Sequence, residues 1–380
     1  MPDVVLEACP DYELGHCRTA LEAALEPLGG LDWVQPGMRI GIKANLVSAM
    51  APETAATTHP ALLTALTVLL KERGASVVIG DSPGGLYNAA HLDRVYRICG
   101  LEQAEAAGAE LNRDFGQKPG TFPEGKVLHS FQYTAWLDGC DAILNFCKLK
   151  THGMMGMSAA VKNFFGTIPG TMKPEYHFRF PDAMDFARML VDLQLYWKPR
   201  LHLVDAVVAM EGNGPTAGTP HPLGLILASE SPFALDEVCA GLLGLEPDRV
   251  LTQAAARERD LIPERLEIQG SPDRFRPASF RLPPTRSTLF RSLLPGKAGE
   301  ALGRTIQKLL APRPQVAPQE CVGCQKCANI CPAKAIEMVQ GKPKIHRDKC
   351  ITCFCCQEFC PKGAMKVQRP PIARLLNKET

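Results

Sequence analysis

Short apolar runs alternate with longer amphipathic segments along the first 270 residues of the chain. Runs typical of buried strands cover Val4–Ala8, Met38–Leu46, Ser76–Gly80, Ala142–Lys148, Leu201–Met210 and Leu223–Ala228. Apolar residues recur at helical spacing over Leu14–Leu28, Pro60–Arg73, Ala89–Cys99, 157–165, Asp182–Trp197 and Pro232–Leu243. This alternation predicts an α/β fold, in which helices cover both faces of a mostly parallel sheet.

The pattern changes after residue 270, where proline and arginine become frequent. Within this stretch, residues 287–310 carry leucines at helical spacing on either side of a break at Pro295-Gly296. The basic residues there could attract a partner or a membrane surface, or they could form the solvated face of a bridging helix. We expect residues 271–316 to be a linker with helical segments.

Charge and composition exclude several classes of protein. The formal net charge of +2 gives no global attraction to nucleic acid or to a membrane surface. No apolar stretch reaches the roughly 18 residues of a transmembrane helix. The first residues include Asp3 and lack a basic segment, which predicts a first strand and not a signal peptide.

The 15 cysteines are an odd number, which does not suit a secreted disulfide framework. We therefore expect a reducing, cytoplasmic location and thiolates that bind metal. Two runs with the same spacing lie near the C-terminus: Cys321-x2-Cys324-x2-Cys327-x3-Cys331-Pro332 and Cys350-x2-Cys353-x2-Cys356-x3-Cys360-Pro361.

This repeated motif resembles the bacterial two-cluster ferredoxin over about residues 317–368. A pair of zinc sites is the alternative, but zinc motifs usually place a second cysteine pair after a longer gap. Matching short strands are expected after each Cys-Pro, at 335–338 and 364–367. We therefore divide the chain into an α/β domain at residues 1–270, the linker, and a small α+β ferredoxin-like domain at residues 317–380.

The resemblance implies two 4Fe-4S clusters with crossed ligands, because in ferredoxins the fourth cysteine of each run binds the other cluster. One set is Cys321, Cys324, Cys327 and Cys360, and the other is Cys350, Cys353, Cys356 and Cys331. Cys355 is additional, either a spare ligand or redox thiol, or a small residue of the loop. No pattern in the sequence indicates a flavin.

Polar residues gather where the predicted strands of the larger domain end. Lys43 and Asn45 end one strand, Asp81 begins a glycine-rich loop after the next, and further charges follow the later strands: Lys148, Lys150, His152, Asp205 and Glu211. Ligands of open α/β sheets bind outside the carboxyl ends of the strands, so these residues predict one cleft. The alternative is a set of ordinary solvated turns.

The runs GIKANL, THP, GDSPGG, NFCKLKTHGMMGMSAAVKNFFGTIPG and VDAVVAMEGNGP resemble the family of the domain of unknown function 362. The resemblance covers most of residues 38–245. Members of that family are often fused to a two-cluster ferredoxin, which implies an iron–sulfur protein. The family supplies no general reaction.

Cations dominate the predicted cleft. Lys148 and Lys150 have the same parity on a strand and are expected to share a face. Thr151-His152-Gly153 is expected to begin a helix whose amides favour an anion, with Lys162 and Asn163 further along it. Carboxylates supply acid–base groups or ligands for a hard metal ion: Asp81, Asp205, Glu211 and Asp236. Dinucleotide-binding, P-loop and nucleophile-elbow motifs are missing from the sequence.

These observations favour a ferredoxin-linked oxidoreductase that reduces an anionic small molecule or bound cofactor. The expected catalytic residues are Lys150, His152, Lys162, Asp81 and Asp205, and the expected binding residues are Lys43, Asn45, Lys148, Asn163 and Glu211. The expected partner is an electron donor or acceptor protein. The alternative is a carrier, maturation partner or redox sensor whose α/β domain docks another protein.

Overall fold

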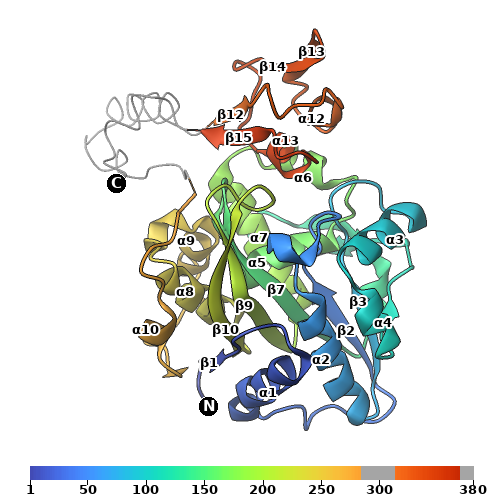
Figure 1. Ribbon diagram of the computed structural model, residues 1–380, viewed down its shortest axis with the longest axis vertical. Coiled ribbons are helices and arrows are strands. Elements are labelled where there is room, and N and C mark those ends of the chain that lie inside the picture. The colour runs from blue at the N-terminus through green and yellow to red at the C-terminus, as the bar shows by residue number, and fades with distance from the viewer. Residues whose placement is uncertain (284–312, 369–380) are drawn as a thin grey trace.

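The structure of the chain, a computed structural model, describes residues 1–283 and 313–368 (Figure 1). Its larger part is built on one sheet, whose strands are β1 (Val4–Ala8), β2 (Arg39–Ala44), β3 (Ser76–Gly80), β4 (Glu110–Leu111), β7 (Ala142–His152), β8 (Gly156–Ser158), β9 (Leu201–Glu211), β10 (Thr219–Ser229) and β11 (Ile268–Gln269). A separate hairpin joins β5 (Gln117–Thr121) to β6 (Ser130–Thr134).

The strand order of the sheet is β11-β1-β10-β9-β7-β2-β3-β4, and β8 pairs with β7. The neighbours β9, β7, β2, β3 and β4 run parallel to one another. Strand β10 is antiparallel to both β1 and β9. The predicted mostly parallel sheet is therefore confirmed, and the carboxyl ends of its central strands meet at one edge.

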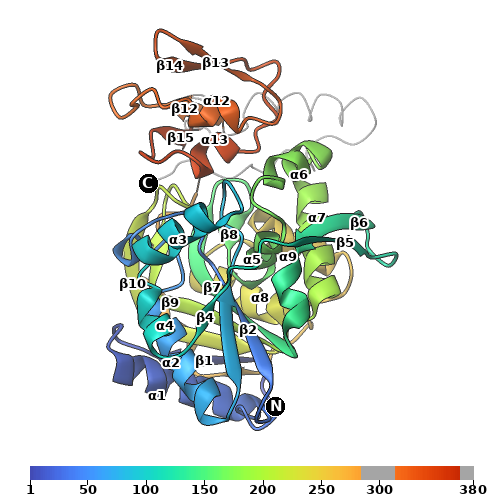
Figure 2. The ribbon, with the colours of Figure 1, turned by 90° about the vertical axis from the view of Figure 1, so that its right-hand side faces the viewer.

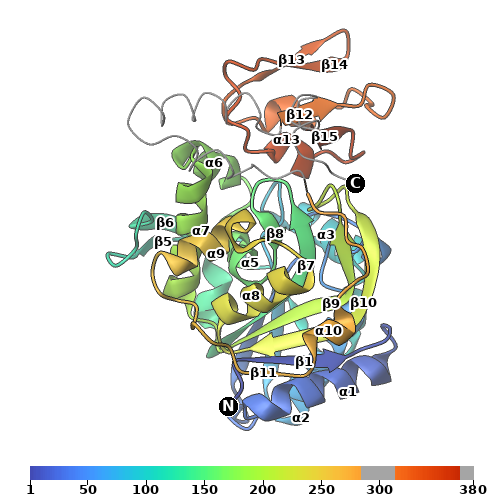
Figure 3. The same cartoon turned by 90° about the vertical axis from the view of Figure 1, so that its left-hand side faces the viewer.

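Helices cover both faces of this sheet (Figures 2 and 3). One face carries α1 (Leu14–Leu25), α2 (Pro60–Glu72), α3 (Ala89–Ile98) and α4 (Glu102–Ala106), and the other carries α5 (Ala160–Asn163), α7 (Ala183–Trp197), α8 (Pro232–Leu242) and α9 (Leu251–Arg257). Side chains along β1 alternate between the two faces. Val5 packs in the core beneath α1 and α2, whereas Val4 and Leu6 pack in the core beneath α8. Single turns of 3-10 helix lie at Glu26–Leu28, Pro52–Thr54, Ala135–Gly139, Phe164–Thr167 and Pro247–Arg249.

A small C-terminal module lies over the carboxyl edge of the sheet, next to α6 (Lys173–Arg179) (Figures 1 and 2). It contains β12 (Arg313–Val316), α12 (Lys326–Asn329), β13 (Ile336–Val339), β14 (Lys342–Ile345), α13 (Cys355–Glu358) and β15 (Met365–Gln368). Strand β12 pairs with β15, and β13 pairs with β14. The two expected strands thus start one residue later than predicted, and β12 comes from the segment that we assigned to the linker.

Only part of the linker falls within the described residues. Helix α10 (Pro272–Phe275) lies near the start of that segment. The helical pieces and basic residues predicted at 287–310 lie outside the described residues. Among those described, no helix is both long enough and apolar enough to span a membrane.

The segment after β7 differs from the prediction. Strand β7 continues through His152, the chain turns, and β8 returns beside it with Lys150 opposite Ser158. The turn requires Gly156, whose φ is +83° and whose added Cβ would lie 2.2 Å from the carbonyl oxygen of Arg249. The expected helix start at Thr151-His152-Gly153 is therefore wrong, and no helix amides are available there to bind an anion.

Candidate functional site

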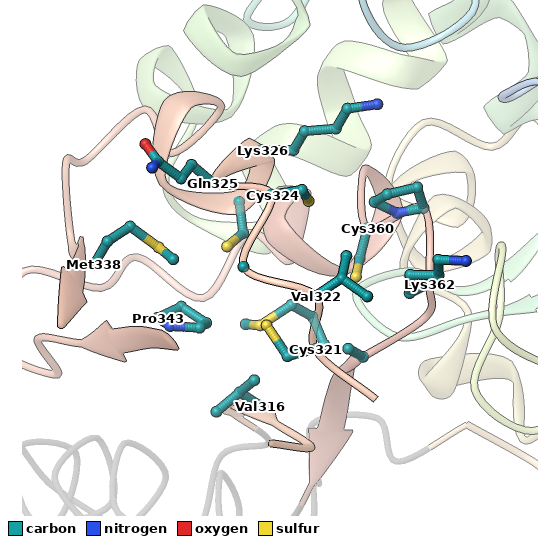
Figure 4. A pocket seen from close by; sticks show the side chains of 15 residues that line it. Val316, Cys321, Val322, Cys324, Gln325, Lys326, Met338, Pro343, Cys360 and Lys362 are labelled. Atoms are coloured by element: carbon teal, nitrogen blue, oxygen red, sulfur yellow. The ribbon is translucent and has the colours of Figure 1, made fainter. Parts of the chain in front are cut away.

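Two cavities in the C-terminal module are lined by cysteines in the combination that the ferredoxin resemblance implies. The first is lined by Cys321, Cys324, Cys327 and Cys360 (Figure 4). The second is lined by Cys331, Cys350, Cys353 and Cys356, and Cys355 lies beside them. Each cavity therefore takes three cysteines from one run and the fourth from the other.

The backbone around the cavities repeats as the sequence does. Residues with positive φ occur at equivalent places in the two runs: Gly323 and Thr352, Gln325 and Phe354, Lys334 and Gly363. These left-handed residues bend each loop tightly enough for three cysteines to face one space. The amide of Ala335 also donates a hydrogen bond to Cys331 Sγ at 3.2 Å.

The residues present fit a cubane cluster. Besides its four thiols, the first cavity is walled mostly by apolar side chains such as Val316 and Met338, and the second by Ile336 and Ile345. Four thiolates in an apolar, loop-wrapped space are the ligand set of a 4Fe-4S cluster. A site for a single metal ion is a different arrangement. Within residues 1–283 and 313–368, no group of three or more His, Cys, Asp or Glu side chains is placed to bind one.

The two cavities differ in depth. At the first, Cys324 is exposed and the Val322 side chain beside it is 61 % exposed. Exposed Lys326 and Lys362 line the same cavity, with their ammonium ends pointing away from the cysteines (Figure 4). At the second, Phe354 and Cys355 are 3 % and 1 % exposed, because α13 packs against the α/β domain.

Hydrogen bonds and apolar contacts fix α13 and β15 on the strand ends. Gln357 Nε2 donates to the Asn213 and Gly214 carbonyl oxygens at 3.0 and 3.2 Å. Phe354 and Val367 join a core cluster that includes Met154 of the β7–β8 turn. The methionines of this turn are therefore core residues, and the second cavity lies against the predicted cleft.

Five basic side chains meet the module at this edge: Lys150, His152, Lys162, Lys173 and His177, which we call the cationic layer. The carboxylate that faces them is Glu358 of α13. His152 Nε2 and Glu358 Oε1 are 3.0 Å apart. Because the amides of Met154 and Met155 both donate to His152 Nδ1, the ring proton lies on Nε2 and is donated to Glu358.

Some members of the cationic layer have all their partners inside the protein. Lys150 Nζ donates to Asn45 Oδ1 at 2.9 Å and to the Ala56 carbonyl oxygen at 2.7 Å. Asn45 is held in turn by Asn163, whose amide also reaches Asn145. The predicted residues Asn45 and Asn163 thus belong to a buried amide chain that positions Lys150.

In other members of the cationic layer, some donor or acceptor atoms form no hydrogen bond with the described residues. Among the described residues, Lys162 Nζ makes no hydrogen bond or ion pair and lies 5.9 Å from the ring centre of Phe165. His177 is 3 % exposed, stacks on Phe186 at 4.3 Å, and leaves its Nδ1 without a partner. Lys173 donates to the Ser82 carbonyl oxygen and lies 5.5 Å from the Phe165 ring centre.

Burial sets the protonation of this region. Desolvation lowers the pKa of Lys150 to about 7, that of Lys173 to about 8 and that of His152 to about 4. The pKa of Glu358 is held well below its usual range, since Lys162 and the hydrogen bond from His152 outweigh the opposing effect of burial. The His152–Glu358 contact is therefore a hydrogen bond from a neutral imidazole to a carboxylate.

Four further predicted site residues form two buried ion pairs beneath the layer. Lys43 Nζ lies 2.7 Å from Asp81 Oδ1, and Lys148 Nζ lies 2.8 Å from Asp205 Oδ2. Both pairs are almost fully buried. Gly166 makes room for the first pair, because an added Cβ would lie 2.1 Å from Asp81 Oδ1.

Both carboxylates are also satisfied by other donors. Asp81 accepts from the amides of Leu46 and Ser82. Asp205 accepts from the Tyr12 hydroxyl and the His59 amide, each at 2.9 Å. The predicted proton carriers are therefore fully bonded in this structure, and both hold strand ends together.

The remaining predicted acids lie elsewhere. Glu211 binds the Arg281 side chain at 2.7 Å and does not join the cationic layer. Asp236 accepts from the amides of Ala160 and Val161, so it caps the start of α5. His59 is the N-cap of α2, and its Nδ1 accepts a hydrogen bond from the Ala61 amide.

Sequence reasoning missed Lys173, His177 and Glu358. The two basic residues lie on α6, a helix without a charged strand end to draw attention to it. Glu358 lies inside the second cysteine run, where only the cysteines were considered. Its place between Cys356 and Cys360 is the one signal that could have placed a carboxylate at this interface.

Comparisons with known proteins find two family models at separate places in the chain. Residues 40–241 match the family model described as "Domain of unknown function (DUF362)", which is more than half of the chain. Residues 313–361 match the 4Fe-4S dicluster domain. Both matches confirm the resemblances, and the second begins where β12 begins.

One curated relative is the thylakoid-associated protein sll1697 of Synechocystis sp. It is 33% identical over 260 residues, which are 68% of this chain and 79% of that protein. Among solved structures, the lactate racemase apoprotein from Thermoanaerobacterium thermosaccharolyticum is similar at a TM-score of 0.40 and 13% identity. That match covers 63% of this chain and 57% of the other.

Proposed function

Because the chain belongs to the family of the domain of unknown function 362 and carries a 4Fe-4S dicluster domain, we propose that it is a two-cluster electron-transfer protein. The observation that carries the proposal is the pair of four-cysteine cavities at different depths. Bound clusters would each accept and release one electron at a time. The ligands of the first are Cys321, Cys324, Cys327 and Cys360, and those of the second are Cys350, Cys353, Cys356 and Cys331.

The surface around the first cavity supports contact with an acidic electron-transfer partner. Val322 offers an exposed apolar contact, and Lys326 and Lys362 add positive charge to the surface around the cavity. Charge complementarity of this kind mainly accelerates encounter. Electrons would therefore enter or leave at the first cavity, while the second faces the α/β domain.

Metal and sulfide analysis tests the proposal. Anaerobically purified protein is expected to contain about eight iron and eight sulfide per chain, because two cubanes are bound. Cys331→Ser is expected to damage the cluster in the second cavity and to leave the other one loaded. Zinc without acid-labile sulfide, or loss of the other cluster in this variant, would contradict the proposal.

A finer proposal is that the α/β domain is the catalytic part of a ferredoxin-linked oxidoreductase, in which the cationic layer binds an anionic small molecule or cofactor. The unpartnered Nδ1 of buried His177 and the unpaired Lys162 support it, since both have unused hydrogen-bonding capacity. Lys173 adds a third donor. Lys150 and His152, which are bonded internally, would position these groups.

Calorimetric titration with oxalate and with inorganic phosphate tests the anion site. Lys173→Gln is expected to weaken binding about tenfold or more, since one charge-assisted hydrogen bond contributes about 1.5–3 kcal/mol. Lys71→Gln, at the exposed end of α2, is the control. Equal affinity in both variants, or no binding to the wild type, would favour a carrier whose α/β domain docks another protein.

A further inference from the structure

The unpaired Lys162 points to a role for the α/β domain in controlling the clusters. Its side chain is partly exposed, and its ammonium has no hydrogen bond or ion pair among the described residues. Like Lys173, it lies over the ring of Phe165, and Phe165 packs in the same core cluster as Phe354, which lines the second cavity. Lys162 is also the basic residue whose charge acts most strongly on Glu358 of the module.

The charges at this interface do not balance within the protein. Lys43 and Lys148 are matched by Asp81 and Asp205. Lys162 and Lys173, which are partly buried, face one module carboxylate, Glu358. An excess of positive charge at a partly buried interface is unfavourable unless an opposite charge lies near.

A cluster in the second cavity would supply that charge. Four thiolates outweigh the iron–sulfur core, so a 4Fe-4S site carries a net charge of about −2, and of about −3 after reduction. The second cavity includes Cys355, which lies at the buried interface. Positive charge close to a cluster stabilises its reduced form more than its oxidised form, because reduction adds negative charge.

We propose that Lys162 is the counter-charge of the cluster in the second cavity and raises its reduction potential. The inference rests on the proposed loading with two clusters. A higher potential at the second cavity would favour the transfer of one electron to an oxidised cluster there from a reduced cluster in the first cavity, which would become oxidised, so no other reactant would be needed.

The lysines near the two cavities differ in their exposure to water, as a selective shift in reduction potential requires. Lys326 and Lys362 lie at the first cavity, but they are exposed and water screens their charge. Lys162 lies on α5, whose first amides are held by Asp236. Val161, its neighbour, packs in the same core cluster as Phe354, so the helix is fixed against the module.

A redox titration of the anaerobically purified full chain, followed by electron paramagnetic resonance, tests the inference. Two midpoints are expected, and the one that changes in Cys331→Ser belongs to the second cavity. In Lys162→Gln, the ratio of reduced to oxidised cluster at that midpoint is expected to fall about tenfold, a shift of about −59 mV. The other midpoint is expected to stay in place.

Variants of opposite charge separate this effect from a change in packing. Glu358→Gln removes a negative charge and is expected to move the same midpoint upward. Lys162→Arg keeps the charge and is expected to keep the wild-type midpoint, and Lys71→Gln is a distant control. A midpoint unmoved by Lys162→Gln, or moved in the same direction by Lys162→Gln and Glu358→Gln, would overturn the inference. Wild-type protein with fewer than two clusters would instead overturn the proposed function.

Discussion

At the scale of single residues, Lys148–Asp205 is one of two buried ion pairs under the candidate site. Both side chains are fully buried, and Lys148 Nζ also donates to the Tyr12 hydroxyl at 2.8 Å. Lys148→Met should lower the free energy of unfolding by about 3–5 kcal/mol, because it leaves a buried carboxylate without its cation. Urea unfolding measures the change.

The matched control is Lys71→Met, whose side chain is exposed and should change stability by less than about 0.5 kcal/mol. The double variant Lys148→Met/Asp205→Asn should regain part of the loss, since it removes both charges together and leaves an amide oxygen as a hydrogen-bond acceptor. If Lys148→Met were no more destabilising than the control, the pair would not hold the strand ends.

Asp236 should make stability depend on pH. Burial raises its pKa to about 7, from 3.8, despite the hydrogen bonds from Ala160 and Val161. Between these values the folded state binds a proton that the unfolded state has released, so this residue's contribution to stability falls as pH rises from about 4 to about 7. The free energy of unfolding can change by up to about 1.4 kcal/mol per pH unit in this range.

Urea unfolding between pH 5.5 and 7.5 isolates this contribution when wild type is compared with Asp236→Asn. The variant should lose the slope, and the difference between the two proteins should vary with pH. Parallel pH profiles would show that Asp236 is ionised at the start of α5 throughout this range. Buried histidines act on both proteins alike and cancel in the comparison.

At the scale of elements, the fit of α13 against the strand-end loops depends on a glycine. A Cβ added at Gly84 would lie 2.6 Å from the ring of Phe359, next to Cys360 of the first cavity. Gly84→Ala should therefore destabilise the docked module by about 1–3 kcal/mol, as overpacking does. Hydrogen–deuterium exchange in α13 and β15 should accelerate.

Gly139→Ala is the matched control for that variant, because no atom lies within 4 Å of the added Cβ. Exchange in α13 should remain at the wild-type rate there. Equal exchange in the two variants would mean that Phe359 moves aside without loosening the module.

The comparison of sequence with structure is also clearest at this scale. Elements with strong periodicity were predicted to within a few residues: α2, expected at Pro60–Arg73, is Pro60–Glu72. The β7–β8 hairpin was missed because methionine, alanine and valine suit a helix, whereas the turn depends on Gly156 and on the backbone of Arg249. Local composition carries no information about that contact.

The candidate site was predictable to a similar extent. Polar residues after parallel strands do meet, because the sheet brings their ends to one edge. Which of these side chains remain available to a ligand depends on contacts between segments that are far apart in the sequence. Asp205 is bonded to Tyr12, and His152 to Glu358, across sequence separations of 193 and 206 residues. No local pattern reveals those partners.

At the scale of the whole molecule, the module and the α/β domain share a boundary that the clusters should stabilise. Helix α13 contains Cys356 and ends two residues before Cys360, so its conformation depends on ligands of both cavities. Removing iron with a chelator under oxidising conditions should loosen α13. Hydrogen–deuterium exchange should then become faster in the β7–β8 turn. An unchanged exchange rate in this turn would show that docking is independent of cluster loading.

The position of α13 has a consequence for the life of the protein in the cell. The same four residues, Cys355–Glu358, include a cysteine that lines the second cavity and a carboxylate that covers the basic strand ends. If α13 loosens without iron, as predicted above, a newly made chain should expose its lysines and the apolar side chain of Met154, and a loaded chain should hide them. Proteases and chaperones recognise such exposed surface, so they should then act on chains without clusters in preference to loaded chains.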